Sequence, residues 1–192
     1  LPILEAQEIL ERHHDALDAR TTYALLARQQ CTELWLAYAC ILQDTDKLVQ
    51  HWIDQKQWNQ ALHTLSAQSA LDAYYASSIA LMQHAPEATI QCWQKCDQLD
   101  VERLIPALLQ YTPAPNESDV VLMYLQHVID VQGSKSPAAH ALRLSRLCER
   151  ASNQSALLKF VESASPGALD LSYALRVCSE AGCREACVRI YA

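Results

Sequence analysis

The chain has 192 residues, of which 51% are hydrophobic and 19% charged, and its net charge is −7. This apolar content supports a substantial core and excludes a disordered tail. The acidic balance predicts no nucleic-acid partner, because phosphate binding needs clustered Lys and Arg. With only three glycines, the chain lacks the material for a phosphate-cradling loop or for a β-rich fold with many tight turns.

Apolar residues recur at helical spacing through the first third of the chain. This periodicity predicts helices over residues 3–14 and 17–30, and a third that starts near Thr32. Asp44 or Thr45 can cap the next helix, because either side chain can accept from a backbone N–H of its first turn. After a polar corner at residues 54–56, the following helix carries one wide apolar stripe, formed by Trp58, Ala61, Leu62 and Leu65.

Residues 74–111 show the same organisation most clearly. One or two helices are predicted within residues 69–83, and Pro86 suits the first turn of the next helix. Asp100 can cap the helix that follows. Pro106 lies inside that helix and is expected to kink or split it, because it removes a backbone hydrogen bond.

The last third begins with a predicted loop over residues 112–118, where Pro113 and Pro115 oppose helix. Helices are predicted over residues 117–131, from Pro137 to about Cys148, and over residues 153–162 and 169–180. After a corner at Gly182, a returning helix carries Cys183, Ala186, Cys187 and Ile190. Their spacing repeats that of Trp58, Ala61, Leu62 and Leu65, which indicates degenerate repeats.

A short striped helix, a tight corner and a returning helix cannot bury their shared apolar face alone. Such a unit needs neighbours on both sides. The sequence therefore predicts an all-α fold, an α-solenoid of stacked antiparallel helix pairs. Residues 1–192 are expected to form a single α-solenoid fragment of a longer protein, since the chain starts at Leu1 rather than Met. No apolar run approaches the roughly 20 residues that a membrane-spanning helix needs.

The eight cysteines fall on apolar stripes, which is typical of buried thiols in a reducing compartment and favours the cytosol. A competing hypothesis is a metal site at Cys178, Cys183 and Cys187, or at Cys92 with Cys96. Thiols four residues apart lie on one helix face, but structural zinc sites usually use a C-x2-C knuckle, and none occurs here. We therefore expect core thiols and neither a metal nor another cofactor.

No catalytic constellation stands out in the sequence. His13, His14 and Asp15 could suggest acid–base chemistry, but neighbouring helical residues point about 100° apart, so a solvated helix end is expected. The five other histidines are predicted to lie on helix surfaces or to be partly buried. The four tryptophans, Trp35, Trp52, Trp58 and Trp93, are candidate interface anchors. Packing between stacked helices is the favoured alternative for them.

Three segments, in order, resemble the C-terminal α-solenoid of the vacuolar protein sorting-associated protein 18 family. The most specific is LDVERLIPALLQY at residues 99–111, preceded by YYASSIALMQHAPEATIQCWQKCDQ. The others are DKLVQHWIDQKQWNQALHTL at residues 46–65 and DLSYALRVCSEAGCREACVRIYA at residues 170–192. The likeness runs from about residue 21 to residue 192. The helix pairs are of the clathrin-heavy-chain-like repeat type.

This resemblance implies a non-enzymatic scaffold in the HOPS and CORVET membrane-tethering complexes, of which the family is a class C core subunit. It implies vesicle docking and fusion at endosomes, lysosomes or vacuoles, with other class C vacuolar protein sorting subunits as partners. Localisation would be cytoplasmic and peripheral, with membrane association through the complex. The family's N-terminal propeller and C-terminal zinc-binding RING are absent here, so no zinc ligand, catalytic residue or partner-binding residue can be assigned. A generic helical-repeat adaptor of a coat-like trafficking complex is the alternative.

Overall fold

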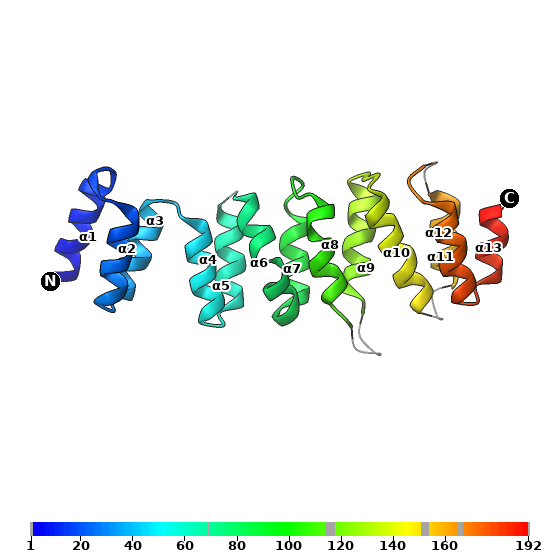
Figure 1. Ribbon diagram of the computed structural model, residues 1–192, viewed down its shortest axis with the longest axis horizontal. Coiled ribbons are helices and arrows are strands. Elements are labelled where there is room, and N and C mark those ends of the chain that lie inside the picture. Colours follow the sequence, from blue (N-terminus) through cyan, green and yellow to red (C-terminus); the bar gives the residue numbers. More distant parts are fainter. Residues whose placement is uncertain (1, 69, 114–117, 151–153, 165–166, 192) are drawn as a thin grey trace. The chain divides into compact units, whose positions relative to one another are not determined.

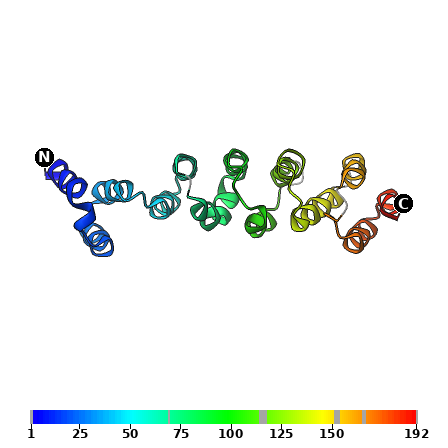
Figure 2. The same cartoon turned by 90° about the horizontal axis from the view of Figure 1, so that it is seen from above.

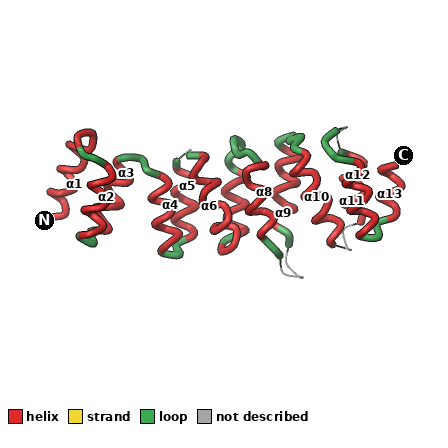
Figure 3. Tube along the Cα trace, viewed as in Figure 1, coloured by secondary structure: helices red, strands yellow, loops and turns green. Residues whose placement is uncertain are grey.

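A computed structural model of the chain describes residues 2–68, 70–113, 118–150, 154–164 and 167–191. These residues form helices joined by short connections, and no strand occurs among them (Figure 3). The predicted all-α fold class is confirmed. The chain divides into two compact units, residues 1–81 and 82–192, and the boundary falls inside α6 (Leu71–His84). A single solenoid over residues 1–192 stays a prediction.

The first unit consists of short helices, most of them about ten residues long, in which α3 packs on α1, α2 and α4, and α4 packs on α5 (Figure 1). Tyr23, Leu34 and Tyr38 are at the centre of its first core cluster. Its elements, before α6, are α1 (Pro2–His13), the 3₁₀ turn η1 (His14–Ala16), α2 (Ala19–Arg28), α3 (Thr32–Ile41), α4 (Thr45–Asp54) and α5 (Trp58–Ala67).

The second unit has two helical layers. Seen from above, α7, α9 and α11 lie in one row and α8, α10 and α12 in the other (Figure 2). Contacts join α7 to α9, α8 to α10 and α10 to α12 within the rows, and α10 to α9 and α11 across them. The elements are α7 (Pro86–Gln94), α8 (Val101–Gln110), α9 (Val120–Gln126), η2 (His127–Val131), α10 (Pro137–Glu149), α11 (Gln154–Ser163), α12 (Leu171–Glu180) and α13 (Arg184–Tyr191). Stacking of successive helices confirms the predicted α-solenoid architecture within this unit.

Aspartate side chains cap the N-termini of several of these helices. A ten-residue helix leaves its first N–H groups without internal partners, and an Asp before the first turn can accept from them. Asp44 caps α4 and Asp100 caps α8, as predicted, and Asp18, Asp119 and Asp170 do the same for α2, α9 and α12. Asp170, for example, accepts from the N–H groups of Ser172 and Tyr173 at 2.8 and 3.1 Å.

Four corners share one way of ending a helix. In each, a residue with left-handed backbone follows the helix, and the next N–H reaches back to a carbonyl five residues earlier. The Gln57 N–H bonds the Trp52 carbonyl at 2.8 Å behind Lys56 (φ 56°), and the Cys183 N–H bonds the Cys178 carbonyl at 2.8 Å behind Gly182 (φ 72°). The corners at Gln30 and Gln43 repeat the pattern. The similarity between the two ends of the chain therefore has a backbone counterpart.

Three predicted segments differ in detail. Residues 69–83 were open to one or two helices, and the described part is the single helix α6. Residues 117–131 are not one regular helix, because α9 widens into the π-helical turn η2 at its end. The predicted loop over residues 112–118 includes Pro115, which lies outside the described residues, as do residues 114–117.

Pro106 does not split its helix, since α8 runs unbroken from Val101 to Gln110. The carbonyl that loses its partner belongs to Glu102, and Glu102 and Pro106 both lie on the exposed side, where water can replace the missing N–H. The prediction that Pro106 splits the helix was therefore wrong, and the kink at Pro106 stays a prediction.

Arg146 holds the other end of this helix. Its buried guanidinium donates to the carbonyl of Leu108 in the last turn of α8 at 3.2 Å and to that of Tyr111, the residue after α8, at 2.6 Å. α8 ends in an extended residue rather than in a left-handed corner. The side chain of α10 therefore supplies the donors that the backbone of α8 lacks, and it fixes α8 to α10.

We expect Lys56→Gly to raise the free energy of unfolding by about 0.5–1 kcal/mol, because glycine adopts the left-handed conformation without the cost that a side chain brings. Gly182→Ala should lower it by about 1 kcal/mol. A Cβ at Gly182 would meet no atom within 4 Å, so backbone strain alone is tested. Urea unfolding of the two variants measures both effects, and shifts of the same sign would contradict this account.

We expect Arg146→Met to lower the free energy of unfolding by about 2 kcal/mol, because one buried and one partly buried carbonyl lose a charged donor while the apolar stem is kept. The matched control is Arg176→Met, which removes an exposed guanidinium over the Tyr173 ring and should cost less than about 0.5 kcal/mol. Chemical denaturation checks both, and equal losses would show that Arg146 does not act as a cap.

Candidate interaction surfaces

The thiols of the second unit gather in its last core. Cys178 of α12 is fully buried, and Cys183 and Cys187 are partly buried beside it. The Cys148 thiol of α10 lies 3.9 Å from the Cys178 thiol, sulfur to sulfur. Spacing within one helix pair could not show this neighbour, because Cys148 comes from the preceding helix pair. Within the described ranges, no group of three or more Cys, His, Asp or Glu side chains is arranged to hold a metal.

Burial shapes the chemistry of these thiols. It is the main reason that the pKa of Cys148 lies far above its usual value, and the nearby Cys178 and Cys183 thiols raise it further. Burial likewise raises the pKa of Cys178.

Not all eight cysteines follow the prediction of buried thiols: Cys92 and Cys178 are buried, Cys40 is exposed, and the rest are intermediate. All eight are free thiols.

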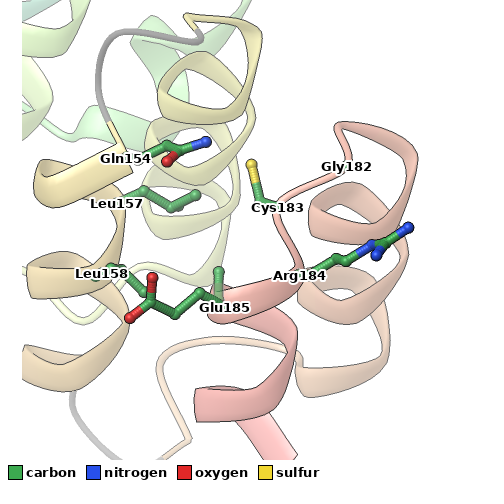
Figure 4. Close-up of a pocket in the computed structure, with 8 residues that line it drawn as sticks. Gln154, Leu157, Leu158, Gly182, Cys183, Arg184 and Glu185 are labelled. Atoms are coloured by element: carbon green, nitrogen blue, oxygen red, sulfur yellow. The ribbon is translucent and has the colours of Figure 1, made fainter.

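A cavity of about 220 Å³ opens beside Cys183 (Figure 4). Leu157 and Leu158 line it from α11, and Cys183, Glu185 and Ala186 line it from the corner and first turn of α13. In the close-up, the Cys183 sulfur points toward α11, whereas Arg184 extends away from the cavity. The cavity therefore gives small molecules access to one thiol of the cluster.

A second cavity, of about 330 Å³, lies between α9, α10 and α11. Arg143 crosses it and donates to both carboxylate oxygens of Asp130 at 2.7 and 3.0 Å. The same guanidinium lies 4.7 Å from the centre of the Phe160 ring, and Phe160 stacks on the buried His140. These contacts hold Arg143 in place, so it stabilises the wall between the helices and is not a free cation for a ligand.

The tryptophans divide between the two predicted roles. Trp93 is fully buried and meets the Tyr124 ring edge-on at 5.5 Å, as packing requires. Trp35, Trp52 and Trp58 are half-buried. Trp35 contacts Tyr23 and His51 in the first unit and lines a cavity of about 280 Å³ there. These three keep an accessible edge, so anchoring a partner stays open for them.

The histidines form no catalytic pair in the described chain. His13, His14 and Asp15 lie at the end of α1 and in η1, where His14 Nε2 is 3.3 Å from an exposed Asp15 oxygen. This is the solvated helix end that the sequence predicted. His140 differs from the prediction, because it is buried and its Nδ1 lies 2.9 Å from the Ser136 carbonyl.

The family of the chain is shown by its similarity to known proteins. The family model for the second half of the VPS18 α-solenoid domain matches residues 46–192. The chain belongs to the VPS18 family. It is 28% identical over 191 residues to "Vacuolar membrane protein pep3" of Schizosaccharomyces pombe, and 30% identical over 189 residues to the "Vacuolar protein sorting-associated protein 18 homolog" of Danio rerio. It is 28% identical over 201 residues to "Vacuolar sorting protein 18" of Arabidopsis thaliana.

These alignments cover 97%, 94% and 98% of the chain but only 21%, 19% and 20% of the relatives. The chain therefore spans about a fifth of the length of these VPS18 relatives. None of the helices in those parts is long and apolar enough to cross a membrane.

For the thiols of this chain we expect a graded reaction with a water-soluble aromatic disulfide reagent near pH 8. Exposed Cys40 should react first, and Cys178 only after unfolding, because Cys178 is fully buried and out of the reagent's reach. The raised folded-state pKa of Cys148 and Cys178 favours folding fully below the unfolded value of about 8.5, and this contribution is lost as pH rises above it. Peptide mapping of timed samples gives the order, and equal rates at Cys40 and Cys178 would refute it.

Proposed function

We propose that this chain is a non-enzymatic scaffold segment of the HOPS and CORVET tethering complexes, acting in vesicle docking and fusion at endosomes, lysosomes or vacuoles. The observation that carries the proposal is the match of residues 46–192 to the second half of the VPS18 α-solenoid. The names of the fission yeast, zebrafish and Arabidopsis relatives, which refer to the vacuolar membrane or to vacuolar sorting, support it.

The architecture of the second unit suits this role physically. Successive helices contact their neighbours in two rows, so that short local contacts generate a long surface. Large apolar side chains remain exposed on it, among them Met123 (54%) and Val131 (72%). Exposed apolar side chains of this size can contribute to association with other proteins.

The partners in this proposal are other class C vacuolar protein sorting subunits, and neither nucleic acid nor a cofactor is involved. The segment would be cytoplasmic and would reach late endosome, lysosome or vacuole membranes only through the complex. Its own contribution is then to keep partner subunits at fixed spacing, which requires a folded helical array and no reacting group.

We expect the purified chain to retain at least one other class C subunit in a pull-down, because a folded solenoid surface is what the partners would recognise. The matched control is Leu144→Asp, which places a charge at a fully buried core position and should abolish both folding and retention. Circular dichroism monitors folding of each variant.

Three outcomes would count against the proposal. A folded chain that retains none of the class C subunits would refute it, and retention of coat-complex subunits instead would favour the generic adaptor. Equal retention by the unfolded control would show that binding is non-specific.

A further inference from the structure

The thiol cluster of the second unit has an order of access. Cys178 is fully buried on α12, and Cys148 approaches it from α10 with 3.9 Å between the sulfurs. Cys183, in the corner between α12 and α13, belongs to the same core but also lines the cavity beside α11. Cys183 is thus open to small molecules, whereas Cys178 is fully buried in contact with Cys148.

Cys183 is the thiol of this cluster that an entering molecule meets first. It immediately precedes α13, and its carbonyl accepts from the Cys187 N–H at 3.2 Å as the helix begins. Its side chain lines the cavity, whereas Cys178 is fully buried and the Cys148 thiol lies against Cys178.

We propose that Cys183 is a peroxide-oxidation site and that Cys148 resolves it, giving a disulfide that joins α10 to the corner between α12 and α13. The cavity admits the oxidant, and the resolving thiol packs against the same core as Cys183. This inference does not depend on the proposed tethering role.

The two steps balance with hydrogen peroxide as the oxidant. The Cys183 thiolate attacks one peroxide oxygen, the O–O bond breaks, and hydroxide leaves, so that sulfur is oxidised to a sulfenic acid and peroxide is reduced. The Cys148 sulfur then attacks the Cys183 sulfur, and the S–O bond breaks. The sulfenic oxygen leaves as water with the Cys148 proton, and the S–S bond remains.

Two neighbouring cysteines fit the resolving role less well. The Cys178 carbonyl accepts from the Cys183 N–H in the corner, and the Cys178 thiol is directed toward Cys148. The Cys187 thiol lies 4.0 Å from the Leu175 carbonyl, toward α12. Cys148 and Cys183 both pack against the last core of the second unit, and α10 and α12 are in direct contact.

The test treats the folded chain with peroxide and maps its disulfides without reduction. Trypsin releases Cys148 in residues 147–150 but leaves Cys178 and Cys183 together in residues 177–184, so a second protease must cut after Glu180. We expect a cross-linked peptide pair that contains Cys148 and Cys183. Reduction should abolish it.

Two variants separate the steps, and exposed Cys40 of the first unit provides an internal control. In Cys148→Ala, a sulfenic-acid trapping reagent should label Cys183, and the cross-link should be lost. In Cys183→Ser, Cys148 and Cys178 should stay reduced. Cys40 should be oxidised in every chain without forming an intramolecular cross-link. Circular dichroism confirms that both variants are folded.

Three results would overturn the proposal. The first is a Cys148–Cys178 disulfide that forms as fast in Cys183→Ser as in the unaltered chain. The second is a folded Cys148→Ala chain in which Cys183 is not trapped while Cys40 is. The third is a Cys183 disulfide that joins two chains instead of two helices of one chain.

Discussion

Unpaired backbone groups at the helix ends are the constraint on which the rest of this structure depends. A helix of about ten residues leaves four N–H and four C=O groups without internal partners and pairs only about six of each. The fold answers with Asp side chains at helix starts and with left-handed corners at several ends. Where α8 lacks such a corner, Arg146 reaches over from α10. Helix ends, and not only apolar stripes, therefore determine which helices stay together.

The sequence predicts what depends on local chemistry. Asp44, Asp100 and Pro86 could be recognised as helix starts because capping and first-turn preferences act within a few residues. The corners at Gln30, Gln43 and Lys56 gave no glycine signal, since the left-handed residue in each carries a side chain. The π-helical turn after α9 has nearly the same apolar spacing as a regular helix and could not be distinguished from one.

Contacts between residues far apart in the chain leave no local signal in the sequence. Arg146 reaches carbonyls 35 and 38 residues earlier, and in sequence it is one more basic residue on an amphipathic helix. The thiols show the same limit: spacing grouped Cys178, Cys183 and Cys187 on one helix pair but gave no reason to add Cys148. Periodicity predicts which face of a helix is buried, whereas the neighbour that covers it is set by stacking.

Stacking also explains how a segment that spans about a fifth of its relatives' length can make much of its packing from contacts within itself. In the second unit each helix contacts its near neighbours along the chain, so few interactions need residues far away in sequence. In such an array, the contacts between each pair of neighbouring helices determine the local stiffness. Cys148 and Cys183 lie on opposite sides of one interface, between α10 and the pair α12–α13. A covalent link there would stiffen that interface directly and would affect the others only through the helices that they share.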